Sequence, residues 1–278
     1  MDRAIDRVPI ADIVTLRTKG NENADGSQKR FGRDLGGNRG LRHGLLRLRH
    51  SQRPYCVPVS RHGNGKGRSV RVLVACERSG MVRDALLALG HDAWSCDLQA
   101  TRATGPHLQC DVRDVLGDDW DGIVAHPVCR RLTNAGAKHL YRRIDGKWSK
   151  DYGIDPEKWA EMEAGAAFFN LFRDATHIKR RIVENPIMHG HAAKLTKGVK
   201  PQYVQPWWFG DAFSKATGLH LFGVKPLVRE YEKSWYAERG IPIKQECWLM
   251  APGPDREEKR SQTYPGIARA LAAAITDC

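Results

Sequence analysis

Short apolar runs alternate with stretches of helical periodicity along residues 70–186. The run Val70–Cys76 is rich in β-branched residues and predicts a strand, after which Val82, Leu86 and the closing Gly90 indicate an amphipathic helix with a glycine cap. Apolar side chains at intervals of three or four predict a second helix over residues 155–175. The same reasoning predicts further strands at residues 93–96, 109–115, 120–126 and 181–185.

Strands that alternate with helices are typical of the α/β class, so we predict a doubly wound, mainly parallel sheet of the Rossmann-like kind. Ligands of such sheets bind outside the carboxyl ends of the strands. Polar or reactive residues follow several of the predicted strands, and these are Ser79, Asp97, Asp111, Cys129, Glu184 and Asn185. The pattern therefore predicts one shared site at this edge of the sheet.

The charge of the chain indicates the class of partner. The formal net charge is +13, and residues 1–68 hold fifteen Lys or Arg against six Asp or Glu. Such a balance favours a polyanion, with nucleic acid as the first candidate. Residues 1–68 lack sustained periodicity, so we predict a basic, disordered extension there, either a DNA-tethering arm or an extension without a role. The folded domain is predicted over residues 69–278.

Several classes of protein are excluded by what the sequence lacks. The seven cysteines include no CxxC pair, so we expect neither a disulfide framework nor a metal site. No run of about 18 apolar residues occurs, and the first residues lack the apolar centre of a signal peptide. We therefore expect a cytoplasmic protein without membrane contact.

The turn at Ser79-Gly80 and the acid at Asp97 are candidates for cofactor contacts. Such a turn can aim backbone N–H groups and a helix N-terminus at an anion, and an acid after the second strand can bind ribose hydroxyls. A dinucleotide-binding loop carries three spaced glycines, whereas this turn has Gly80 alone, so a structural turn remains an alternative.

Cys129 is the candidate nucleophile. It follows the strand-ending Pro127 on a loop that also carries Arg130 and Arg131, and positive neighbours lower the pKa of a thiol. A lone cysteine is more often a small buried hydrophobe. The predicted delivery of Glu184 to the same edge of the sheet favours chemistry, because a carboxyl group there can donate a proton to a ring nitrogen.

Taken together, these segments resemble the motifs of the cytosine-5 DNA methyltransferase family. The matching segments occur in the family's order and are Leu73–Gly80, Asp97, Cys110–Asp114, His126–Cys129, Glu184–Pro186 and Arg260–Pro265. The resemblance covers roughly residues 70–278 and is strongest to compact members encoded by phages or prophages. It implies a class I S-adenosylmethionine-dependent methyltransferase fold and a DNA substrate.

The resemblance implies a role for each matched residue. Cys129 is the implied nucleophile towards cytosine C6, Glu184 the partner of the ring nitrogen and amine, and Asn185 the residue that holds the loop of Cys129. The implied contacts to S-adenosylmethionine are Cys76, Ser79, Gly80, Asp97, Asp111, Val112 and Pro127. The target base must be flipped out of the duplex for this chemistry.

DNA contacts are expected from basic side chains near the site. The candidates are Arg130, Arg131, Lys138, Arg142, Arg143, Lys215 and Arg260. Target recognition is assigned to a minimal insert around residues 218–255, which is too short for rich base readout. The aromatic run Trp207–Phe209 could stack on a base, but core packing is the commoner role.

Three departures from the family pattern leave other functions open. Val128 stands where the family has a proline, Pro186 follows Glu184-Asn185 where the family has a valine, and the first motif keeps one glycine. One alternative is a methyltransferase acting on the exocyclic amine of adenine or cytosine. A second is a non-catalytic DNA-binding protein, and a third is an enzyme that transfers another group to a pyrimidine.

Overall fold

The apolar runs of the sequence form a seven-stranded sheet in the computed structural model, which describes residues 69–197, 200–245, 250–251, 253 and 256–277. These residues belong to one compact unit, Gly67–Cys278. The prediction for residues 1–68 lies outside the described residues.

The strands of the central sheet are short and mostly buried. They are β1 (Arg71–Ala75), β2 (Asp92–Asp97), β3 (His107–Gln109), β4 (Gly122–Ala125), β7 (Arg180–Asn185), β8 (Gln202–Val204) and β9 (Thr217–Phe222). A separate hairpin consists of β5 (Arg143–Ile144) and β6 (Lys147–Trp148).

The α-helices are α2 (Met81–Ala88), α3 (Asn134–Ala137), α4 (Pro156–Arg173), α5 (Gly190–Thr196), α6 (Lys233–Glu238), α8 (Arg256–Ser261) and α9 (Pro265–Thr276). Single 3₁₀ turns are η1 (Val112–Asp114), η2 (Lys138–Leu140), η3 (Lys150–Tyr152) and η4 (Pro206–Phe209). Asp155 caps α4 through its side chain and Pro156 occupies the first turn, as the sequence predicts for a helix start.

The order of strands across the sheet is β3-β2-β1-β4-β7-β9-β8. β1, β2, β3, β4 and β7 run parallel, and β9 lies antiparallel between β7 and β8. The sheet confirms the predicted doubly wound, mainly parallel α/β fold. Its strand order and reversed β9 are those of the Rossmann-like class I methyltransferase fold.

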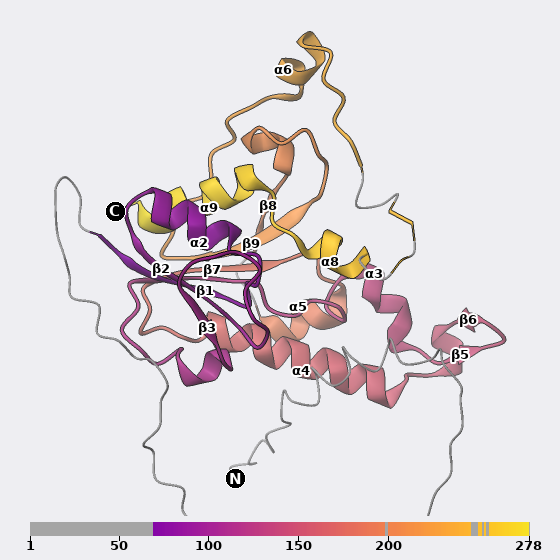
Figure 1. The fold of residues 1–278 in the computed structure, drawn as a ribbon. Helices are drawn as coiled ribbons and strands as arrows, with labels where there is room; N and C mark the ends of the chain where they lie inside the picture. The colour runs from indigo at the N-terminus through magenta and orange to yellow at the C-terminus, as the bar shows by residue number, and fades with distance from the viewer. Residues whose placement is uncertain (1–68, 198–199, 246–249, 252, 254–255, 278) are drawn as a thin grey trace, which may run out of the picture. The chain divides into compact units, whose positions relative to one another are not determined.

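Helices cover both faces of the sheet, because successive side chains of a strand point to opposite faces (Figure 1). On one face, α2 and α9 pack with the sheet around Val72, Val124 and Ile182. On the other face, α4 packs against Leu73 and Ile123. The strands are buried on both sides, which explains their continuous apolar runs.

The third predicted strand was wrong over most of its length. β3 ends at Gln109, and residues 112–114 form η1 instead. The cause is Asp111, whose Oδ1 accepts a hydrogen bond from Arg113 N at 3.0 Å and turns the chain out of the extended form.

Residues 218–222 of the predicted recognition insert form most of β9, which lies between β7 and the edge strand β8 of the sheet. That part of the insert is therefore sheet, and only residues 223–255 remain outside it. In the described part of the chain, no helix is both long and apolar enough to cross a membrane.

Candidate functional site

The carboxyl ends of the parallel strands meet at one edge of the sheet. Ala75 of β1 pairs with Cys96 of β2 and with Ala125 of β4, and Ala125 pairs with Val183 of β7. The residues that follow on each strand therefore lie side by side along this edge. They include Cys76, Asp97, His126 and Glu184, three of which the sequence placed in the site.

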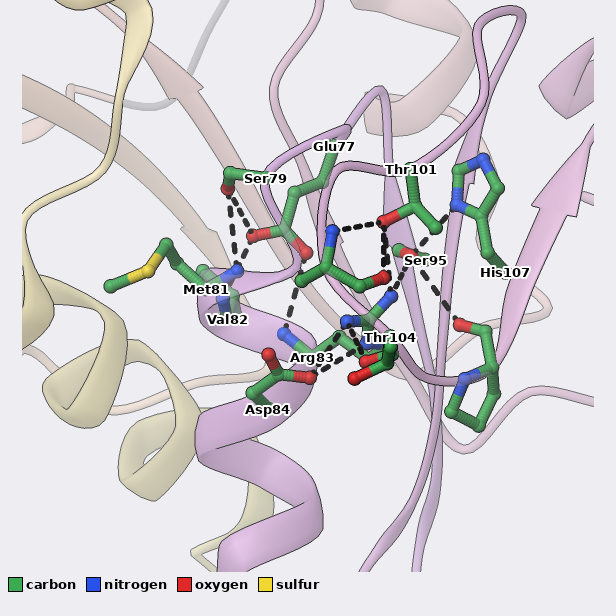
Figure 2. A network of polar contacts seen from close by, with 12 residues as sticks. Glu77, Ser79, Met81, Val82, Arg83, Asp84, Ser95, Thr101, Thr104 and His107 are labelled. Carbon is green, nitrogen blue, oxygen red and sulfur yellow. Dashed lines mark hydrogen bonds and ion pairs between the residues drawn. The ribbon is translucent and has the colours of Figure 1, made fainter.

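Glu77 occupies the start of α2, a role that the sequence analysis did not assign. Its carboxylate is buried and accepts hydrogen bonds from Val82 N at 2.8 Å, Arg83 N at 3.4 Å and the Ser79 hydroxyl at 3.2 Å (Figure 2). A carboxylate satisfies the free N–H groups of a first helical turn and complements its dipole. The amides of Val82 and Arg83 are therefore already used by the protein.

Position 80 requires a glycine for two reasons: its backbone is left-handed, and the guanidinium of Arg83 occupies the space of a Cβ atom. Gly80 has φ +77°, and a Cβ atom there would lie 2.3 Å from a guanidinium nitrogen of Arg83. Arg83 is fully buried and donates to Ser95 Oγ at 3.1 Å and to Thr104 O at 2.9 Å (Figure 2). Arg83 thus fastens the loop between β2 and β3, which begins directly after Asp97, to the start of α2.

Asp97 ends β2 and Asp111 lies two residues after β3, and both carboxylates are partly exposed. Asp97 Oδ1 accepts from Gln99 N at 2.9 Å, which fixes the carboxylate beside the loop that Arg83 holds. Asp111 caps η1, and the side chain of Val112 is buried in the core beneath it. The two carboxylates present acceptors at the ends of β2 and β3.

Cys96 and Cys110 lie near these acids, with their sulfur atoms 3.9 Å apart. Burial raises the pKa of the Cys96 thiol far above its usual range, and burial also raises the pKa of the Cys110 thiol. Both therefore remain thiols at neutral pH, and neither is suited to be a nucleophile.

The loop that carries Cys129 is fastened to the loop that follows β7. Thr133 forms a β-bridge with Met188, and Asn134 N donates to Ile187 O at 2.9 Å. Cys129 itself is partly exposed, and its carbonyl accepts from Leu132 N in a tight turn. The structure therefore joins the segment of Cys129 to the segment of Glu184 and Asn185, as the sequence predicted for this edge.

His189 holds this junction together. Its Nε2 lies 2.7 Å from Arg131 O, while its Nδ1 accepts from Ala192 N at 3.3 Å and caps α5. Burial lowers the pKa of His189, so the ring is neutral at pH 7 with Nε2 as the donor. Asn185 was expected to hold the loop of Cys129. Its Nδ2 instead donates a hydrogen bond to Pro186 O, at 2.6 Å.

Glu184 and Asn185 point to opposite faces of the sheet because they are consecutive on β7. Glu184 is partly exposed and faces His126, the next residue after β4, with Nδ1 3.9 Å from Oε2. The other ring nitrogen of His126 is buried and has no hydrogen-bond partner among the described residues. Asn185 is buried, and its Oδ1 likewise lacks a partner there.

Two of the basic residues predicted to contact DNA have partners within the protein. Arg131 has a side chain only 12% exposed, and its Nε lies 2.5 Å from Glu161 on α4. Lys215 Nζ donates to the carbonyls of Arg260 and Gln262 at 2.7 and 3.0 Å. Both cations therefore already have partners in the fold. By contrast, the candidates with exposed side chains are Arg130, Lys138, Arg142, Arg143 and Arg260.

The aromatic run of η4 belongs mainly to the core. Trp207 and Phe209 are buried, and Tyr236 donates to Trp207 O at 2.8 Å. Core packing, the commoner role for such a cluster, is confirmed for these two residues. Pro127 is also buried, at the end of β4.

Four residues of this edge were missed by sequence reasoning: Glu77, Arg83, His126 and His189. Glu77 stands five residues before Val82, too far for the usual capping spacing, so no local pattern marks it as a cap. His126 could have been found, since it ends a strand one residue before Pro127. Among the described residues, no group of three or more His, Cys, Asp or Glu is placed to hold a metal ion.

Comparison with known proteins gives matches to solved structures. No protein-family model and no curated protein matches the sequence. One similar structure is a protein described as a DNA modification methyltransferase encoded within a prophage (E. coli), at 13% identity and a TM-score of 0.35; the match covers 55% of this chain and 46% of that chain. Another is a methyltransferase of Entamoeba histolytica, at 12% identity and a TM-score of 0.34, with 66% and 61% covered. The present chain thus spans less than two thirds of the length of either protein.

Proposed function

We propose that this protein is a DNA cytosine-5 methyltransferase that uses S-adenosylmethionine. The observation that carries the proposal is the junction of two loops at the carboxyl edge of the sheet. One loop holds Cys129 and the other follows Glu184, and His189 together with the Thr133–Met188 bridge ties them. A thiol and a carboxyl group joined in this way are the two groups needed to activate a pyrimidine ring.

The chemistry of the acceptors at this edge fits S-adenosylmethionine. Its ribose hydroxyls and adenine amine are hydrogen-bond donors, and Asp97 and Asp111 offer carboxylate acceptors at neighbouring strand ends. In our proposal Asp97 binds the ribose and Asp111 the amine, with Cys76, Ser79, Gly80, Val112 and Pro127 lining the site. When bound, the cofactor supplies an electrophilic methyl group. Arg83 keeps the loop after Asp97 in place.

The proposed chemistry at the base begins with Cys129. Its thiolate adds to C6 of a flipped cytosine, while Glu184 hydrogen-bonds N3 and the exocyclic amine. The addition makes C5 nucleophilic, so that C5 would take the methyl group and S-adenosylhomocysteine would be released. A base then removes the C5 proton, and the electrons of that bond restore the C5–C6 double bond as the thiolate leaves C6. His126, which faces Glu184 Oε2, orients that carboxyl group so that its other oxygen meets the base.

DNA is the proposed partner, held by Arg130, Lys138, Arg142, Arg143 and Arg260. The basic residues 1–68 are proposed to add contacts to the phosphates from outside the described unit. We propose a phage or prophage type of enzyme working in the cytoplasm of a bacterial cell.

Mass spectrometry of nucleosides tests the proposal. DNA incubated with the protein and S-adenosylmethionine is expected to yield 5-methylcytosine, and the Glu184→Gln variant to yield about a hundredfold less per unit time. Formation of N4-methylcytosine or N6-methyladenine would instead support an amino-methyltransferase. Absence of any modified base, together with salt-sensitive DNA binding, would support a non-catalytic DNA-binding protein.

A further inference from the structure

The β5–β6 hairpin is an exposed ribbon at the same edge of the sheet as the candidate site. It lies between the loop of Cys129 and the first turn of α4, and Figure 1 shows it extending from the end of α4. Arg143 pairs with Trp148 and Ile144 pairs with Lys147. Asp145 and Gly146 have φ values of +49° and +78°, the left-handed pair of a tight type I′ turn.

The base of this ribbon is fixed to the body of the protein. Tyr141 forms a β-bridge with Ile154, and Arg142 N donates to Gly153 O at 3.0 Å. The hydroxyl of Tyr141 lies 3.2 Å from Nε2 of His191, on α5. The ribbon is therefore a rigid projection whose position relative to the candidate site is set by the fold.

The ribbon and its flanks carry cations that the described residues do not neutralise. The basic residues are Lys138, Arg142, Arg143, Lys147 and Lys150, and within the described part of the chain none of them forms an ion pair with a carboxylate. Two cations lie over the Trp148 ring: Lys138 Nζ is 5.0 Å and Arg143 Cζ is 4.6 Å from its centre. Such stacking orients the cations without cancelling their charge.

In the rest of the predicted recognition insert (218–255), three of the cations in the described part are paired with carboxylates. Arg229 pairs with Glu232, Lys225 with Asp277, and Arg239 with Glu238. A cation that is already paired gains less binding free energy from a phosphate, because it must first give up its existing partner. The ribbon thus carries unpaired positive charge near the site, in addition to that of Arg130 and Arg260.

The dimensions of the ribbon fit the major groove of a DNA duplex. Two strands about 4.8 Å apart, with side chains, fit a groove about 12 Å wide but not one about 6 Å wide. Two residues per strand reach about 7 Å, comparable to the major-groove depth of about 8.5 Å. Ile144 is 47% exposed beside the tip, where an apolar side chain can contact a thymine methyl group.

We propose that the β5–β6 ribbon enters the major groove of duplex DNA beside the target base, with Arg142 and Lys147 on the phosphates and Ile144 at the base edges. This inference rests on the proposed function for its substrate. It moves base recognition from residues 223–255 to the ribbon.

The test measures DNA binding by fluorescence anisotropy over a range of salt concentrations, using the full chain and a cytosine-containing duplex. The Arg142→Gln/Lys147→Gln double variant is expected to lower the slope of log affinity against log salt by about 1.8, since each phosphate contact contributes about 0.9. The matched control is Lys179→Gln, an exposed lysine directly before β7 at the opposite edge of the sheet, which should leave the slope unchanged. Equal slopes for the double variant and the wild type would overturn the inference.

A groove competition completes the test. Methyl green, which occupies the major groove, should displace the wild-type protein, whereas the minor-groove ligand netropsin should not; the reverse result would overturn the inference. Ile144→Ser should alter which flanking sequences are methylated while the salt slope stays the same. If the wild type forms no methylated base, the proposed function fails, but the slopes and the competition still decide whether the ribbon binds DNA.

Discussion

At the scale of single residues, the cysteines separate by environment. Cys96 and Cys110 are neighbours whose pKa values are raised by burial, and they lie below the acids that end β2 and β3. Cys129 lies on a loop next to the exposed Arg130. The difference in setting, rather than the type of residue, selects Cys129 as the candidate nucleophile.

Replacement of Cys129 therefore has the larger expected effect. Cys129→Ser should lower the rate of methyl transfer by about a thousandfold or more, since serine is a far weaker nucleophile at neutral pH. Cys110→Ala, which removes a protonated thiol, should keep the rate within about threefold. Rates of tritiated methyl transfer to DNA measure both, and full activity of Cys129→Ser would exclude the proposed chemistry.

The ion pair of Arg131 with Glu161 indicates a role for this cation in stability. Because its guanidinium is paired with Glu161, Arg131→Gln should destabilise the protein by about 1–3 kcal/mol, the loss of a hydrogen bond to a charged group. The same change should leave the salt dependence of DNA binding as it is in the wild type. Urea unfolding and anisotropy titrations measure the two effects; a reduced salt slope would return Arg131 to the DNA-contacting residues.

At the scale of elements, α2 and the Cys129 loop are both held by side chains that the periodic pattern of apolar residues does not mark. Val82, Leu86 and Gly90 predicted α2 correctly, but the cap comes from Glu77 through a turn that contains Gly80. Likewise, Pro127 predicted that a loop follows β4. The attachment of this loop depends on the contact of His189 with Arg131, which lies 58 positions earlier in the sequence. Periodicity reports local structure and carries no information on such contacts.

Loss of the cap on α2 should be visible in stability. Glu77→Ala leaves the N–H groups of Val82 and Arg83 without their acceptor and should lower the free energy of unfolding by about 1–2 kcal/mol. Urea denaturation followed by circular dichroism measures this. An unchanged midpoint would show that the cap does not stabilise the helix.

His189 links stability to pH. Its pKa in the folded protein lies below the ordinary value of 6.5, so the unfolded chain takes up a proton first as the pH falls. Stability should therefore decrease as the pH is lowered from about 6.5 towards the folded pKa. In His189→Gln, which keeps an amide donor near the position of Nε2, the decrease between pH 7 and pH 5.5 should be smaller than in the wild type. If urea unfolding showed the same pH dependence of stability for the wild type and the variant, the role given to His189 would be contradicted.

At the scale of the whole molecule, the sequence predicted four of the five parallel strands, β1, β2, β4 and β7, and the helices α2 and α4, because each is a continuous apolar or periodic run. β8 and β9 escaped prediction because they join the sheet through pairings that the sequence pattern does not report: β9 pairs with β7, and β8 pairs with β9. The apolar run of β9 was visible in the sequence, but it was assigned to a recognition insert that the sheet does not allow.

The sequence predicted that the candidate residues share one edge of the sheet, but it did not predict the contacts that hold them there. The edge of the sheet was found from the polar residues that end each strand, because parallel strands must bring their carboxyl ends together. The partners of the basic residues near the site were not predicted. In the sequence Arg131 and Lys215 look like free cations, whereas in the structure Arg131 pairs with Glu161 and Lys215 donates to two backbone carbonyls. Such pairings require the packed chain.

The central claim is that Cys129 adds to cytosine C6, and covalent trapping tests it most directly. In DNA that carries 5-fluorocytosine, C5 has no proton to lose after methyl transfer, so the thiolate cannot leave. With S-adenosylmethionine present, the account predicts a protein–DNA adduct that survives denaturation and maps by mass spectrometry to the peptide of Cys129. An adduct on another residue, or none with a protein that still methylates ordinary DNA, would contradict it.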